Sequence, residues 1–190
     1  GDKLLVTCEL VYVYADPVSQ TSRPVPQVLR ALFPAFEAGE AMTRVVVGDW
    51  QTLGADAGKV RKEVFVHEQG IPESEEWDVQ DASAVHAVVY NRLHMPLATG
   101  RLLVGAAEQG AQVGKIGRMA AKRVLRGAHL GRSVLDALVE RAAARGDQLV
   151  LLHAQRSAAG FYAKAGFTER GAPYDEVGIA HIDMVMSLGA

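Results

Sequence analysis

The chain has 190 residues, of which 49% are hydrophobic and 22% are charged, and its formal net charge is −2. This composition is typical of a soluble globular protein with one good core. It argues against a nucleic-acid-binding protein, which would need clustered Lys and Arg, and against a membrane protein, which would need longer apolar runs.

The single cysteine, Cys8, excludes an internal disulfide, and no segment has the pattern of a signal peptide. Both observations favour a cytoplasmic protein. The six histidines lack the paired spacing that is typical of metal ligands, so we expect no metal.

Residues 1–41 are predicted to form a strand, a loop and a helix. Residues 3–14, KLLVTCELVYVY, are rich in β-branched and aromatic side chains and predict the strand. Pro26 and Gly39 are typical of the two ends of a short helix, which we expect from Gln27 to Ala38. Because an unpaired apolar strand is a sticky edge, we expect this appendage to pair with the chain's own sheet or with a partner subunit in a homodimer.

Residues 42–190 alternate between predicted strands and helices. Strands are predicted at 43–47, 84–90, 97–103, 113–121, 149–154, 167–170 and 179–188, and helices at 53–69, 130–145 and 157–165. Residues 73–81 are acidic, and we expect a mobile, solvated loop that could also attract a cationic amine. This order predicts an α/β fold in which helices flank a central twisted mixed sheet.

The most informative stretch runs from Ile116 to Gly146, a predicted strand, glycine turn and helix. Apolar residues at three- and four-residue steps make one helical stripe, and Gly146 ends the helix. In the turn, Arg126 to Gly131, small residues let successive N–H groups point into one concavity at the positive end of the helix. The pattern predicts a phosphate or pyrophosphate site, although a plain connection has the same pattern. The turn lacks the Gly-Lys-Ser/Thr of a Walker loop and the features of a dinucleotide fingerprint.

Four further motifs accompany this turn in a consistent order. They are RxxVFVxEQ at residues 61–69, IGR at 116–118, AQ followed by FYxxxGF at 154–167, and GIxHIxM at 178–184. Together they resemble the GNAT superfamily of acyl-CoA-dependent N-acetyltransferases, and in particular its ElaA-like branch, over residues 43–188. Residues 1–41 resemble the closing strand and last helix of a hotdog-fold thioesterase.

The GNAT resemblance implies that acetyl-CoA is the cosubstrate. The pantetheine arm would pair with the central strand at Met119, Ala120 and Ala121. The pyrophosphate would lie on the turn and the first helical turn, and Ser157 joins the predicted coenzyme site. The turn residues are Arg126, Gly127, Ala128, His129, Leu130, Gly131, Arg132 and Ser133.

Three features of the sequence bear on this coenzyme site. His129 stands where the superfamily has a glycine, which weakens the predicted phosphate grip, and Gln155 replaces a common Asn. Lys115 and Arg118 are either phosphate ligands or solvated residues at a strand end.

The resemblance also implies candidate catalytic residues. Tyr162 would protonate the departing thiolate, with packing of its ring as the alternative. Glu68 is the first candidate for the general base, with a role as a structural cap or anchor as its alternative. His181 is the next candidate, His67 and His153 are further ones, and a water relay would need no direct base.

The preferred function is direct transfer of an acetyl group to a primary amine of a small molecule or peptide, within a ternary complex. No cysteine lies in the motif region, so an acyl-cysteine intermediate is not expected. A coenzyme-A-binding regulator or scaffold with a degenerate site is the second candidate. A thioesterase-related acyl-CoA hydrolase is the third.

Overall fold

The computed structural model describes every residue except 1–6, 8, 10, 177 and 190. The chain divides into two compact units, Gly1–Met42 and Thr43–Ala190. In the first unit, helix α1 spans Gln27–Glu37 and is followed by Gly39 in the left-handed conformation, with φ +71°. The predicted helix is therefore confirmed.

The strand predicted over residues 3–14 is wrong where it can be examined. Residues 11–14 adopt no strand, and residues 3–6, 8 and 10 lie outside the described residues. A single bridge between Ala15 and Ser22 is the β-pairing described in this unit. A β-prone composition does not make a strand unless a partner supplies the ladder of hydrogen bonds.

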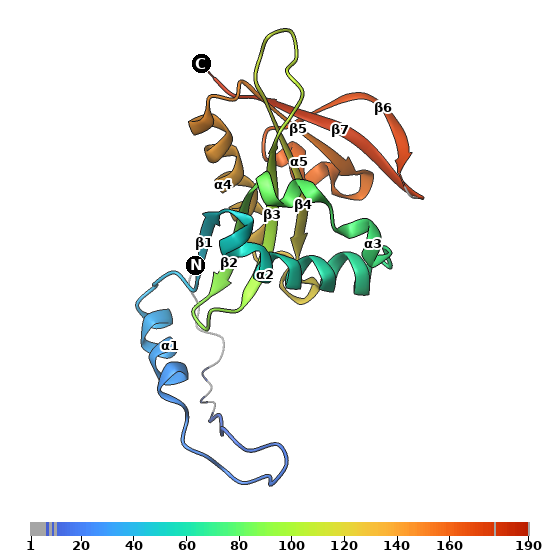
Figure 1. The fold of residues 1–190 in the computed structure, drawn as a ribbon. Helices are drawn as coiled ribbons and strands as arrows, with labels where there is room; N and C mark the ends of the chain where they lie inside the picture. Colours follow the sequence, from blue (N-terminus) through green and yellow to red (C-terminus); the bar gives the residue numbers. More distant parts are fainter. Residues whose placement is uncertain (1–6, 8, 10, 177, 190) are drawn as a thin grey trace. The chain divides into compact units, whose positions relative to one another are not determined.

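The second unit is built on a seven-stranded sheet (Figure 1) with the order β1-β2-β3-β4-β5-β7-β6. Only β4 and β5 are parallel, and the other neighbouring strands are antiparallel. The predicted mixed sheet is confirmed. The strands are β1 Thr43–Gly48, β2 Val85–Asn91, β3 Pro96–Val104, β4 Val113–Ala121, β5 Leu149–Gln155, β6 Thr168–Glu176 and β7 Ile179–Ser187.

Helices cover both faces of this sheet, as the alternation along β2 shows. Ala87 and Val89 belong to the core cluster of α4, Leu130–Arg145, whereas Val88 and Tyr90 belong to that of α2, Trp50–Arg61. Successive strand residues point to opposite faces, so α2 and α4 lie on opposite sides. The short helix α5, Ala159–Lys164, packs in the α4 cluster.

Two connections differ from the prediction. The helix expected over residues 53–69 begins earlier, as α2, and continues beyond Arg61 as a π-helical segment, Lys62–Glu68. The acidic loop expected at residues 73–81 is instead folded, as the short helix α3, Glu73–Glu76, and a 3₁₀ turn, Val79–Ser83.

Buried ion pairs hold this acidic segment in place. Arg61 is 1% exposed, and its guanidinium donates to the carboxylates of Glu76, at 2.5 Å, and Asp81, at 2.8 Å. The rings of Trp50 and Trp77 lie 5.4 and 5.0 Å from its Cζ atom. Buried charges need partners, so the acidic residues here serve the core and not a solvated loop.

The same pairing links stability to pH through Asp81. Burial raises the pKa of this carboxyl, but hydrogen bonds from Arg61 and Arg101 outweigh burial and lower the pKa below its usual value of 3.8. A lowered pKa in the folded state means that ionised Asp81 stabilises the fold above about pH 4. This contribution is lost as the pH falls through the lower pKa of the folded protein.

Replacing Arg61 tests the role of the buried cluster. We expect Arg61→Met to lower the free energy of unfolding by about 3–5 kcal/mol, because it leaves Glu76 and Asp81 buried without their main partner. Urea unfolding followed by circular dichroism measures this loss. The control is Lys59→Met, which removes an exposed pair with Asp56 and should change the value by at most about 0.5 kcal/mol. A loss below about 1 kcal/mol in Arg61→Met would contradict the assignment.

Candidate functional site

The site begins where β4 and β5 part. Their parallel pairing is described from Val113 to Ile116 on β4 and from Leu149 to Leu152 on β5. Both strands continue beyond these residues, to Ala121 and Gln155. The later part of β4 therefore offers its backbone groups to an extended ligand that adds on as a strand.

A β-bulge between Gly117 and Ala120 changes the direction of the side chains of β4. Thr99 pairs with Ala120 and Arg101 pairs with Gly117, so Arg118 and Met119 lie opposite a single residue of β3. Arg118 adopts φ +52°, in the left-handed region. Bulges of this kind are frequent beside active sites.

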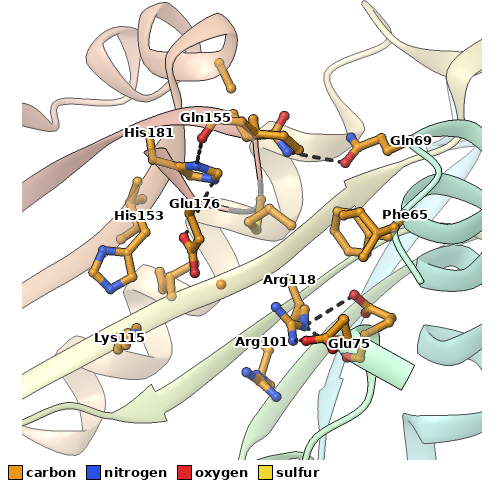
Figure 2. Close-up of a pocket in the computed structure, with 18 of the residues that line it drawn as sticks. Phe65, Gln69, Glu75, Arg101, Lys115, Arg118, His153, Gln155, Glu176 and His181 are labelled. Carbon is orange, nitrogen blue, oxygen red and sulfur yellow. Dashed lines mark hydrogen bonds and ion pairs between the residues drawn. The ribbon is translucent and has the colours of Figure 1, made fainter. Parts of the chain in front are cut away.

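A cavity of about 360 Å³ opens at the parting of the two strands (Figure 2). Its walls come from β3, β4, β5, β7, the π-helical segment and the acidic segment. Gln155 on β5 donates from Nε2 to Oε1 of Gln69 at 3.3 Å, which links the two sides. Gln69 was not singled out from the sequence, although it ends the RxxVFVxEQ motif.

Tyr162 lines this cavity and is 8% exposed. The rings of Phe161 and Phe167 pack edge-on against it, with centroids at 4.9 and 6.0 Å. Burial alone raises the pKa of Tyr162 to about 12, so the hydroxyl is protonated at neutral pH and is a hydrogen-bond donor. Ser157, predicted to join the site, is exposed on the 3₁₀ turn before α5 and does not line the cavity.

His181 presents an imidazole to the same cavity. Its Nδ1 lies 2.7 Å from the carbonyl oxygen of Ile179, and Nε2 lies 4.0 Å from the carboxylate of Glu176. A carbonyl can only accept, so Nδ1 carries a hydrogen and the neutral ring leaves Nε2 as an acceptor. His153 also lines the cavity, but its Nδ1 is bound to Asp183 at 2.6 Å.

Glu68, the first candidate for the general base, forms an ion pair with Arg126. Its two carboxylate oxygens accept a bidentate pair from Arg126, at 2.6 and 2.7 Å, and it does not line the cavity. The hydrogen bond from Arg126 lowers the pKa of Glu68, which makes it a weaker base. This geometry argues against Glu68 as the general base and favours the anchoring role. His67, a further candidate, is exposed and also lies outside the lining.

The turn before α4 has the backbone that an anion site needs. Gly127 and His129 are both left-handed, with φ +91° and +59°. No side chain caps the helix, and in the described part of the chain the N–H groups of Leu130, Gly131 and Arg132 have no backbone acceptor. Free N–H groups at the positive end of a 16-residue helix favour a bound anion.

Several side chains of the turn have partners within the protein. Arg126 is committed to Glu68 and to the carbonyl of Ala121, and Arg132 is committed to Asp136. The N–H of Ala128 is bonded to the carbonyl of Leu125. Ser133 donates both its N–H and its hydroxyl to the carbonyl of His129, and Leu130 is buried in the core.

The predicted pantetheine segment spans both faces of β4. Met119 lines the cavity, whereas Ala120 is buried with Val64 and Phe65 of the π-helical segment. Ala121 ends the strand, and its carbonyl accepts from Arg126. The turn, the strand end and the π-helical segment are thus tied together.

Among the described residues, no three or more His, Cys, Asp or Glu side chains are grouped so that they could hold a metal ion. Within the same residues, no helix combines the length and the apolar character that crossing a bilayer requires.

Comparison with known proteins assigns the family. The model of the acetyltransferase (GNAT) domain matches residues 59–188, and the chain belongs to this family. The uncharacterised N-acetyltransferase YjcF of Bacillus subtilis is 34% identical over 131 residues, which cover 68% of this chain and 89% of that protein. The GNAT domain that the sequence motifs predicted is therefore confirmed.

Two solved structures are similar to the chain. An acyl-CoA N-acyltransferase from Pseudomonas aeruginosa is 28% identical with a TM-score of 0.66, and ElaA from Escherichia coli is 24% identical with a TM-score of 0.65. Each similarity covers 76% of this chain and 99% of the other. The resemblance of residues 1–41 to a thioesterase is not supported, because the family match begins at residue 59 and the expected strand is absent from residues 11–14.

The anion site at α4 is tested by changing Gly127. We expect Gly127→Ala to weaken coenzyme A binding about tenfold, because an alanine at positive φ costs about 1–2 kcal/mol and turns the free N–H groups away. Isothermal titration calorimetry measures the dissociation constant. The matched control is Gly110→Ala, which carries the same strain at φ +86° in the loop between β3 and β4 and should leave coenzyme affinity unchanged. Equal affinity in both variants would contradict the site.

Proposed function

We propose that this protein transfers an acetyl group from acetyl-CoA to a primary amine, by direct attack of the amine on the thioester. The observation that carries the proposal is the parting of β4 from β5 beside the buried phenol of Tyr162. The pantetheine arm would extend along β4 at Met119, Ala120 and Ala121. A backbone N–H of the same strand would bind the thioester oxygen, an interaction worth about 3 kcal/mol in comparable sites.

The diphosphate of the coenzyme would rest on backbone groups more than on charged side chains. Arg126 and Arg132 keep their carboxylate partners, which leaves the N–H groups at the start of α4 and the helix dipole as the main attraction. His129 replaces the usual glycine but adopts the left-handed conformation that a glycine favours. The turn can therefore keep its path at a cost of about 1–2 kcal/mol.

The reaction moves one proton from the amine to the sulfur. A C–N bond forms and the C–S bond breaks, so the amine loses a proton and the thiolate gains one. Tyr162, which lines the cavity, would supply the proton to sulfur. Burial raises the pKa of this phenol to about 12, and the same lack of water disfavours a bare thiolate in the cavity, so the phenol remains a useful donor.

His181 is the group that best fits the proton acceptor. Its Nε2 is free of a hydrogen when Nδ1 donates to Ile179, and the side chain lines the cavity. Glu176 lies 4.0 Å from Nε2 and would stabilise the imidazolium that forms. Glu68 has no such access.

A second candidate function is a coenzyme-A-binding protein without turnover. The commitment of Glu68, Arg126 and Arg132 to ion pairs favours it, because it removes three groups that the motif would supply. The two functions differ in one measurement. A transferase releases free thiol from acetyl-CoA in proportion to added amine, whereas a binding protein does not.

The proposal also covers location, domain organisation and the acceptor. We place the protein in the cytoplasm, with residues 42–190 as the transferase domain, residues 1–41 as an appendage, and a small molecule or peptide as the acceptor. Exposed apolar side chains on α1, with Phe33 and Phe36 at 63% and 71%, support a homodimer through the appendage.

Removing the phenol hydroxyl tests the proposed role of Tyr162 as the general acid. We expect Tyr162→Phe to lower kcat about 100-fold, the usual size of general acid catalysis, and to leave coenzyme A affinity and the unfolding midpoint almost unchanged. Amine-dependent thiol release measures kcat. The control is Tyr90→Phe, another buried tyrosine whose pKa is raised to about 12 but which lies outside the cavity lining. Unchanged kcat in Tyr162→Phe would assign its ring to packing.

Removing the imidazole tests the proposed role of His181 as the general base. We expect His181→Gln to lower the rate at neutral pH about 100-fold and to restore part of it at higher pH, where the free amine loses its proton without help. The pH profile of kcat/KM measures this recovery. His67→Gln is the control and should keep the profile of the unchanged protein. A uniform loss at every pH would indicate a binding role instead.

A further inference from the structure

Three cationic side chains gather on one wall of the cavity. Lys115 and Arg118 lie on β4, and Arg101 lies on β3. In the sheet register Arg101 is opposite Gly117 and Leu103 is opposite Lys115, so Arg101 and Lys115 are diagonal neighbours on one face. Figure 2 shows the three side chains toward one end of the cavity and His181 and Gln155 toward the other.

These cations retain hydrogen-bonding capacity. Arg101 is 5% exposed and donates through Nη1 to Asp78 and Asp81, but its buried Nε has no partner and the structure describes none for Nη2. Arg118 is held by contacts of 3.3–3.5 Å to residues of the acidic segment. For Lys115, no ion pair is found among the described residues.

The ion pairs around the cavity do not include Lys115. The carboxylates of Glu76 and Asp81 are paired with Arg61 and Arg101, and Asp78 lies between Arg101 and Arg118. Two exposed carboxylates also line the cavity: Glu75, and Glu176, which lies 4.0 Å from Nε2 of His181. Among the described residues neither is paired with Lys115, so its ammonium group is available to an anionic ligand.

This anion is not a phosphate of the coenzyme. The candidate diphosphate site follows the far end of β4, after Ala121, whereas Lys115 lies near its start. Six residues of strand separate them by roughly 20 Å. Lys115 and its diagonal neighbour Arg101 therefore face the part of the cavity beyond the acyl group, where the acceptor would lie.

We propose that the acceptor amine carries a carboxylate, which binds to Lys115 and to the free side of Arg101, with Arg118 closing over it. This assignment rests on the proposed acetyl transfer and narrows its substrate to amino acids in the broad sense. Lys115 is a specificity residue, because it orients the amine toward the thioester without touching the reacting atoms.

A matched series of substrates tests the subsite. Glycine, β-alanine, 4-aminobutyrate and 5-aminopentanoate are compared with their carboxamides in the thiol-release assay. We expect one chain length for which kcat/KM of the acid exceeds that of the amide at least tenfold, and this length reports the distance from the subsite to the thioester. Lys115→Gln should lower kcat/KM of that acid at least tenfold and leave the amide unchanged.

Two further variants test whether the charge of Lys115 sets the preference for acids. Lys115→Glu should reverse the preference, so that the amide becomes the better substrate. Lys59→Gln removes an exposed lysine on α2, at 68% side-chain exposure, and should change neither substrate. Equal rates for acids and amides, or equal losses for both in Lys115→Gln, would overturn the subsite while leaving acetyl transfer intact.

A binding measurement separates failure of the subsite from failure of the transferase. The N-acetyl derivative of each amino acid is titrated into the full chain loaded with coenzyme A. Binding that Lys115→Gln abolishes supports the subsite even if no amine releases thiol, in which case acetyl transfer is wrong. Absence of binding for every acid would overturn the subsite whatever the activity.

Discussion

The end of the hydrogen-bond ladder between β4 and β5 is the constraint on which the site depends. The ladder is described as far as Ile116 and Leu152, and both strands then continue without pairing to each other. Backbone groups that lose a strand partner need another acceptor or donor, so this gap is suited to an extended ligand. The bulge at Arg118 turns the side chains of β4 at the same point. Tyr162, His181 and the cations of β4 all face the resulting cavity.

The buried cluster around Arg61 links the stability of the fold to one wall of the cavity. Arg61 on α2 and Arg101 on β3 share the carboxylate of Asp81. The acidic segment that they hold contributes Glu75, Glu76 and Gln80 to the cavity wall. Because removing one partner of a buried pair is strongly destabilising, we expect this wall to be rigid, as the proposed acceptor site would require.

Charge is distributed unequally over the two ends of the site. At the start of α4, Arg126 and Arg132 are neutralised by Glu68 and Asp136, and free backbone N–H groups remain. On the opposite side of the cavity, Lys115 has no described counter-ion. In the proposed function, the backbone groups at the start of α4 would bind the coenzyme phosphates with little dependence on side chains, and Lys115 would select the acceptor by charge.

The motifs were enough to identify the family, because they resemble those of known GNAT proteins. The mixed sheet and the helix that Gly146 caps followed from local periodicity and turn chemistry. Local pattern was not enough for the acidic segment. The run of carboxylates in this segment is typical of a solvated loop, but in the structure Glu76 is paired with Arg61, 15 residues away. In the same way, the motif predicts that Glu68 lies near the amine entrance, but its carboxylate is paired with Arg126, 58 residues away. Only the tertiary structure decides which charges meet, since ion pairs form between residues that chain folding, and not sequence spacing, brings together.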